Sequence, residues 1–177
     1  YQPQGTGPFP VLLDVHGGAW HDKDRFANVP MCEAVAKSGV LVVAIDTTLS
    51  HEAPFPASVQ DVHYGIRWLK AKAREWKGDP STLGVLGSSS GGHVAQLVAM
   101  RPRDPRYSAL PLATAPALDA TVRCVIMTSP VIDPLGRYRY AKDLKAKGGP
   151  TPVKPDELIP CHDAYWKTEE AMDEGAP

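Results

Sequence analysis

The sequence predicts a mostly parallel, doubly wound α/β sheet with helices on both faces and a small cap built from loop insertions. Four short runs are continuously apolar, as in strands that helices cover on both sides. Helical patterns separate these runs, and this alternation is typical of a right-handed parallel sheet. The chain has 177 residues, 43% of them hydrophobic and 22% charged, which suits one domain with a sizeable core. The strands are expected at residues 9–15, 40–45, 83–86 and 122–128.

Three helices are expected between these strands, at residues 30–38, 58–76 and 91–100. The first is followed by Gly39, a residue suited to ending a helix. The second opens with Ser58 and Asp61 at the spacing of a capping box, and its apolar residues recur on one face. The third begins only a few residues after the third strand, so that strand and helix are joined by a sharp turn.

Two further stretches fit neither pattern. Residues 101–121 are rich in Pro and Ala, and residues 136–160 are rich in Pro, Lys and Gly. Both are expected to be long excursions that leave the sheet after strand ends, where the sites of α/β proteins are built. We expect one domain over residues 1–177, truncated at both ends, with residues 136–170 as a cap or lid. The aromatic residues of this cap either line a pocket or pack its interior, with packing preferred.

Charge and cysteine usage exclude several classes of protein. Nineteen basic and twenty acidic residues give a net charge of -1, and without a long basic run neither a nucleic acid nor an anionic membrane is an expected partner. The apolar runs are too short to cross a bilayer. Three widely spaced cysteines form neither a disulfide framework nor a zinc pattern, which favours a reducing, cytoplasmic location.

Residues 87–91 read Gly-Ser-Ser-Ser-Gly and match the pattern G-x-S-x-G, with Ser89 at its centre. Between a predicted strand and a predicted helix, this pattern forms a nucleophile elbow. Such a turn holds the central residue in a strained conformation, and its neighbours must be small because larger side chains would collide across it. We therefore predict that Ser89 is a nucleophile. The alternative, a flexible Ser/Gly linker, would not normally join two apolar segments directly.

A second motif, His-Gly-Gly-Ala-Trp at residues 16–20, follows the first predicted strand. Together the two motifs resemble the α/β-hydrolase superfamily, and within it the hormone-sensitive-lipase-like serine esterases. Residues 46–69 extend the resemblance through a Pro-Phe-Pro-Ala segment, although Thr47 and Thr48 replace the usual Tyr-Arg. Ser90 likewise stands where Ala is common in the family. The resemblance covers the chain to about Asp133 and implies an α/β-hydrolase core that is incomplete in this chain.

The resemblance also implies roles for individual residues. The backbone N–H groups of Gly18, Ala19 and Ser90 would form an oxyanion hole, the site that stabilises the negative charge of the tetrahedral intermediate. His16 would orient the loop and would not act as the catalytic base. No metal and no organic cofactor are implied.

A serine hydroxyl needs a histidine that is positioned by a carboxylate, and on this fold the acid and then the histidine follow the serine. Asp133 and His162 are the candidates within the chain, although Asp133 alternatively caps a turn before Pro134 and His162 lies in the expected cap. The preferred interpretation is that the chain is an N-terminal fragment. A complementary C-terminal segment or chain would then carry the acid and base, and would cover the apolar edge strand at residues 122–128.

The expected activity is that of a serine carboxylesterase that cleaves short-chain or aryl esters through an acyl-enzyme on Ser89. Its partner would be a small-molecule ester. Two alternatives stay open. An amidase or arylformamidase of the same fold resembles the chain in its H-G-G-x-W motif, and a binding protein without activity could use the same scaffold, since fold does not dictate function.

Overall fold

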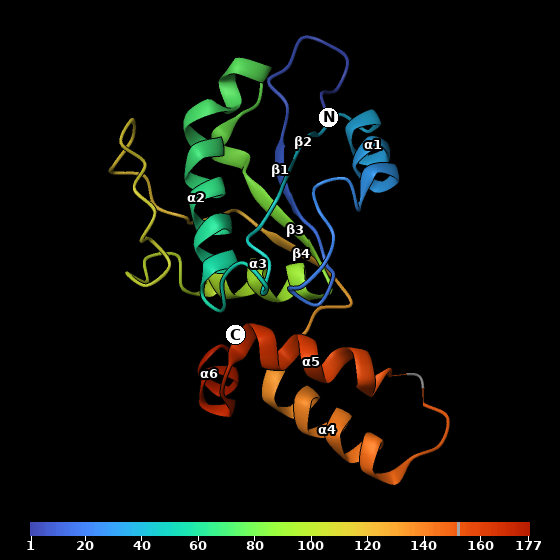
Figure 1. Ribbon diagram of the computed structural model, residues 1–177. Helices are drawn as coiled ribbons and strands as arrows, with labels where there is room; N and C mark the ends of the chain where they lie inside the picture. The colour runs from blue at the N-terminus through green and yellow to red at the C-terminus, as the bar shows by residue number, and fades with distance from the viewer. Residues whose placement is uncertain (152) are drawn as a thin grey trace.

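The computed structural model describes residues 1–151 and 153–177, and its centre is a parallel sheet (Figure 1). The strands are β1 (Val11–Val15), β2 (Leu41–Ile45), β3 (Gly84–Ser88) and β4 (Val125–Thr128), in the order β2-β1-β3-β4. Val15 pairs with Ile45 on one side and with Gly87 on the other. The central strands therefore end at the same edge, and the loops that follow β1 and β3 become neighbours there.

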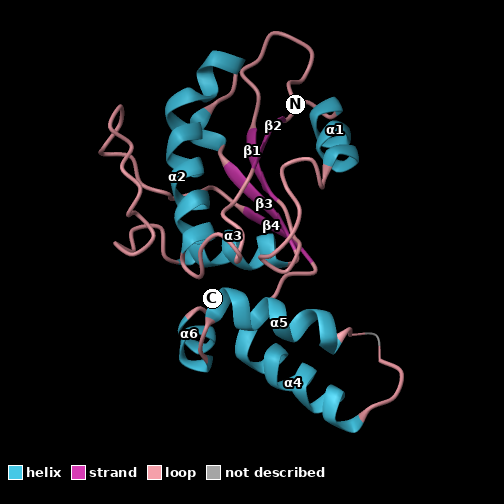
Figure 2. Cartoon of the chain, viewed as in Figure 1, coloured by secondary structure: helices cyan, strands magenta, loops and turns pink. Residues whose placement is uncertain are grey.

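Helices cover both faces of this sheet (Figure 2). One face carries α1 (Val29–Lys37), and the other carries α2 (Ala57–Lys72) and α3 (Ser90–Met100). Because side chains alternate along a strand, Leu12 of β1 packs with Cys32 of α1, whereas Leu13 belongs to the larger cluster that includes Ile66 and Leu97. Two apolar layers thus enclose the sheet, and the predicted doubly wound architecture is confirmed.

The predicted capping box at the start of the second helix is wrong. Helix α2 begins at Ala57, and no side chain caps its first turn. Ser58 Oγ instead forms a hydrogen bond of 2.6 Å with the hydroxyl of Tyr165, and Asp61 Oδ2 accepts the N–H of Thr48 at 2.6 Å. Both side chains make tertiary contacts with distant segments, and these contacts outweigh the local capping pattern.

Residues 136–160 are mostly helical, which corrects the expectation of an irregular excursion. They fall in α4 (Pro134–Lys147) and α5 (Pro155–Trp166), and α6 (Glu169–Glu174) follows. Both longer helices start with proline at their first position, where its missing N–H costs nothing. Of the prolines that suggested a loop, Pro155 therefore marks a helix start and Pro160 lies inside α5.

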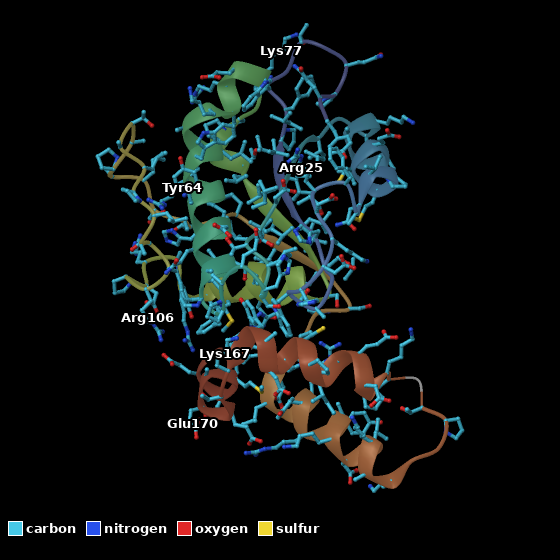
Figure 3. All side chains as sticks on the ribbon, viewed as in Figure 1. Arg25, Tyr64, Lys77, Arg106, Lys167 and Glu170 are labelled. Carbon is cyan, nitrogen blue, oxygen red and sulfur yellow. The ribbon has the colours of Figure 1, made fainter. Side chains whose placement is uncertain are left out.

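Helices α4, α5 and α6 lie together to one side of the sheet (Figure 1). They span the region 136–170 expected as a cap, in which residue 152 lies outside the described residues. Side chains fill the space between these helices and the sheet, with Lys167 at the end of α5 (Figure 3). Residues 101–121 are irregular as predicted and run beside α2, where His63 Nε2 donates to the carbonyl of Pro102 at 3.0 Å.

Candidate active site

Ser89 lies between β3 and α3 with φ 52° and ψ -116°. A positive φ is rare for a residue other than glycine and costs about 1–3 kcal/mol, so the surrounding structure must hold it. The N–H of Ser89 donates to the carbonyl of Thr128 at 2.8 Å, and the N–H of Val131 donates to the carbonyl of Ser89 at 3.3 Å. The segment at and after β4 therefore fixes the strained turn that the G-x-S-x-G pattern predicts.

The glycines around Ser89 are required by close contacts between backbone segments. A Cβ on Gly87 would lie 2.5 Å from the carbonyl oxygen of Gly91, and a Cβ on Gly91 would collide with the carbonyl oxygens of Val15 and His16. A Cβ on Gly17 would lie 2.9 Å from the carbonyl oxygen of Ser88. The loop after β1 is therefore pressed directly against the turn that carries Ser89.

This loop has an unusual backbone, because Gly18, Ala19 and Trp20 have successive positive φ values of 104°, 53° and 58°. The side chain of Ser90 holds it, since Ser90 Oγ accepts the N–H of Trp20 at 3.2 Å in a buried position. Within residues 1–151 and 153–177, no acceptor takes the N–H of Gly18, Ala19 or Ser90. The three predicted oxyanion donors are thus unpaired among the described residues.

His16 is buried beneath the same loop. Its Nδ1 donates to the carbonyl of Gly17 at 2.8 Å, and its Nε2 accepts from the hydroxyl of Thr47 at 3.3 Å. Both ring nitrogens are therefore engaged in holding the loop. This arrangement agrees with the orienting role that the family resemblance implies, and Thr47 is one of the three residues named above that depart from the family pattern.

Two cavities flank Ser89. The first, of about 630 Å³, is walled by the loop after β1 on one side and by α4, α5 and the segment before α5 on the other. The second, of about 430 Å³, is walled by residues 129–133 and by Gly136 and Tyr140 of α4. Ser89 and Arg137 are the two residues that line both cavities. Residues of the region predicted as a cap therefore line both cavities beside the serine.

The predicted acid and base do not meet Ser89. Asp133 lines the second cavity, but its Oδ1 accepts the N–H of Gly136 at 2.7 Å and caps α4. His162 is fully buried, its Nδ1 donates to the carbonyl of Leu158 at 3.0 Å, and burial lowers its pKa to about 4. Among the described residues, neither side chain forms a hydrogen bond with Ser89 Oγ or with the other.

A buried aromatic cluster, centred on Trp20, joins the loop after β1 to the cap. Trp20 stacks on Tyr165 of α5 at 4.9 Å, and the rings of His93 and His162 meet it edge-on at 5.4 Å and 5.2 Å. Burial also lowers the pKa of His93 to about 4. The packing predicted for the aromatic residues of the cap is confirmed for Tyr138, Tyr165 and Trp166, which are buried, and is wrong for Tyr140, which is 52% exposed and lines the second cavity. The sequence held no signal for the Trp20 contacts, because they join residues far apart in the chain.

In the part of the chain that the structure describes, no three His, Cys, Asp or Glu side chains are grouped so that they could hold a metal ion. None of the helices described has the length and apolar character needed to cross a bilayer.

Comparison with known proteins agrees with this geometry. A family model described as BD-FAE matches residues 1–143. Among relatives in Mycobacterium tuberculosis, the probable carboxylic ester hydrolase LipM is 36% identical over 103 residues, which is 58% of this chain and 24% of LipM. Esterase LipC is 33% identical over 119 residues, which is 66% of this chain and 30% of LipC. The chain thus spans about a quarter to a third of the length of these relatives.

Solved structures of esterases share the fold. The bacterial heroin esterase superposes with a TM-score of 0.72 at 27% identity, over 93% of this chain and 48% of that one. The thermophilic esterase Est2 from the planctomycete Thermogutta terrifontis superposes with a TM-score of 0.65 at 25% identity, over 76% of this chain and 48% of that one.

Proposed function

The chain belongs to the BD-FAE family and has the predicted α/β-hydrolase fold, and from this premise we propose that the protein is a serine carboxylesterase that acts through an acyl-enzyme on Ser89. The observation that carries the proposal is the strained conformation of Ser89, φ 52° and ψ -116°, at a junction that two cavities flank. Strain of this kind persists where function requires it. The names of the relatives, which are esterases, support the ester as substrate.

In the proposed reaction, Ser89 Oγ attacks the carbonyl carbon of a short-chain or aryl ester, and its proton is taken by a base. The carbonyl oxygen becomes an oxyanion, which the N–H groups of Gly18, Ala19 and Ser90 stabilise. One such donor is worth about 3 kcal/mol in acyl-transfer enzymes. The alcohol leaves with a proton, and water then releases the acid from Ser89.

We further propose that the base and the acid lie outside these 177 residues, in a complementary segment or chain. Ser89 Oγ has no hydrogen-bond partner among the described residues, although a serine nucleophile needs an adjacent base. Of the six histidines, four donate to backbone carbonyls and one contacts Ser50: His16, His63, His93, His162 and His21. The sixth, His51, is exposed and its ring meets that of His21 edge-on at 5.5 Å. The exposed edge of β4, where Ile126 is 47% exposed, supports a covering segment.

The proposal is tested by hydrolysis of p-nitrophenyl butyrate by the full-length protein. Ser89→Ala should lower kcat by about 10⁴-fold or more, since it removes the nucleophile. Ser88→Ala is the matched control, because the Ser88 side chain forms no hydrogen bond with a described residue, and its kcat should stay within about threefold. Equal rates for Ser89→Ala and the wild type would reject Ser89 as the nucleophile.

The amidase alternative is separated by the substrate. Comparing kcat/KM for p-nitrophenyl butyrate and for N-formylkynurenine in the same preparation decides between ester and amide specificity. An esterase should favour the butyrate ester, whereas an arylformamidase should favour the amide. A protein that hydrolyses neither and whose Ser89 does not react would be a binding protein on this scaffold.

A further inference from the structure

Arg137 of α4 lies beside Ser89, and its guanidinium has no partner among residues 1–151 and 153–177. It lines both cavities that flank Ser89. Its Nη1 is completely buried, and its guanidinium donates no hydrogen bond to a described residue. The other arginines withdrawn from solvent, Arg67 and Arg101, donate to backbone carbonyls. Arg137 is therefore the exception among the buried and half-buried arginines that the structure describes.

The acidic side chains around Arg137 are engaged elsewhere. In the first cavity, Glu157 pairs with Lys154 at 3.0 Å, and Asp22 Oδ1 accepts the N–H of Lys23 at 2.7 Å. In the second cavity, Asp133 caps α4 through Gly136. No ion pair to Arg137 occurs within the described ranges of the chain, and burial lowers the pKa of its guanidinium. Cys161, in the same wall, opposes this shift and raises the pKa of Arg137.

Burying a guanidinium without a partner costs free energy, because the group loses its hydration and gains no hydrogen bond in return. Arginine is therefore rarely buried unless it is paired. Its planar fork of N–H groups matches a carboxylate, which it binds through two parallel hydrogen bonds. The cavities that Arg137 lines are the spaces in which the acyl and alcohol parts of an ester on Ser89 would lie. A carboxylate on either the acyl or the alcohol part of the substrate would therefore lie next to Arg137.

We propose that Arg137 binds a carboxylate carried by the substrate, so that the protein prefers esters with a free acid group near the ester bond. This inference rests on the proposed function, because it names the class of ester that the same site accepts. Arg137 is then a specificity residue. It contacts the anionic group of the substrate, whereas Ser89 and the oxyanion donors act on the ester bond.

The first test compares charged and neutral esters of matched shape in the full-length protein. On the acyl side, p-nitrophenyl hemiglutarate is compared with the ester in which an isopropyl group replaces the carboxylate. On the alcohol side, para-acetoxybenzoate is compared with para-acetoxybenzamide. Arg137→Gln should lower kcat/KM roughly 10- to 100-fold for a carboxylate ester on at least one side and less than about threefold for its neutral partner.

Arg139→Gln is the matched control, because Arg139 lies on the same helix, is exposed, and pairs with Glu169 on the surface. It removes the same charge and should leave all four rates within about twofold. Arg137→Lys should retain part of the preference. If Arg137→Gln slows charged and neutral esters equally, or lowers the unfolding midpoint by several degrees, Arg137 is a structural residue and the inference is wrong.

A second measurement does not depend on turnover. Monomethyl glutarate is titrated calorimetrically into the Ser89→Ala protein and into the Ser89→Ala, Arg137→Gln double variant. Binding that is weakened about tenfold or more in the double variant supports the carboxylate site, even if the protein hydrolyses no ester and the proposed function fails. Equal binding by both variants contradicts the site, even if ester hydrolysis is confirmed.

Discussion

The small residues around Ser89 are required for different physical reasons. Gly91 is the tightest, since a Cβ there would meet the carbonyl oxygens of Val15 and His16, which belong to backbone and cannot rotate away. Ser90 differs, because it has room for a side chain and uses that side chain to hold Trp20. The triplet of serines is therefore three different positions: a strained centre, a buried anchor and a small filler.

Gly91→Ala should unfold or displace this turn. The collision with backbone atoms is expected to cost more than about 2 kcal/mol of unfolding free energy and to abolish ester hydrolysis. Gly65→Ala, within α2, is the control, because its Cβ would meet a movable side-chain atom, Ile45 Cδ1, at 3.2 Å. Its stability should change by less than about 1 kcal/mol in urea denaturation. Similar losses in both variants would mean that the turn is not specially constrained.

Ser90→Ala tests the anchor of the loop after β1. The substitution keeps the backbone N–H proposed as an oxyanion donor, but it leaves the buried N–H of Trp20 without an acceptor. We expect a loss of about 1–2 kcal/mol in stability and a several-fold fall in kcat, with KM little changed. Urea denaturation and p-nitrophenyl butyrate kinetics measure both quantities. A Ser90→Ala protein that behaves like Ser88→Ala would show that the hydrogen bond does not position the loop.

At the scale of elements, aromatic side chains attach α5 to the loop after β1. Trp166 and Tyr165 of this helix pack against Trp20, and His162 lies between Trp20 and Tyr138. Because Trp20 ends the H-G-G-A-W motif, the position of α5 and the shape of the oxyanion loop depend on the same cluster. The two buried histidines make this attachment sensitive to acid.

The cluster predicts a loss of stability at acidic pH. The pKa of His162 falls from 6.5 to about 4 in the folded protein, and that of His93 does the same, so the unfolded chain binds more protons between these values. The contribution is complete above about pH 6.5 and is lost as the pH falls towards 4, about 3 kcal/mol per histidine. Asp163 opposes this shift of His162 and Arg137 adds to it.

His162→Phe keeps a ring in the cluster and removes the titrating group. Its unfolding free energy should fall less steeply than that of the wild type between pH 6.5 and 4.5, with His93 accounting for the remaining slope. Chemical denaturation at a series of pH values gives both curves. Parallel curves for the two proteins would show that His162 is not buried in its neutral form.

Strand β4 lies at the edge of the described sheet and exposes apolar side chains. Ile126 is 47% exposed and Met127 is 37% exposed on a strand that pairs only with β3 in the described sheet. An apolar strand edge promotes pairing with other chains. The isolated 177 residues should therefore self-associate, and Ile126→Lys should reduce light scattering at equal concentration. Unchanged association would mean that another surface is responsible.

At the scale of the molecule, the sequence predicted the sheet and the serine turn well because both depend on local patterns. Buried parallel strands are continuously apolar, and G-x-S-x-G depends on steric limits within five residues. The irregular excursion predicted at residues 136–160 was wrong, since Pro155 suggested a loop but begins a helix. No local sequence pattern predicts the proposed role of Arg137, because that role depends on the position of α4 beside Ser89.

If Ser89 is an activated nucleophile, a fluorophosphonate should react with it in the full-length protein. An unactivated serine does not react, and peptide mass mapping locates the phosphonate. We predict labelling at Ser89 alone, with none at Ser88 or Ser90 and none in the Ser89→Ala variant. No label on the full-length protein, or a label on another serine, would contradict the account.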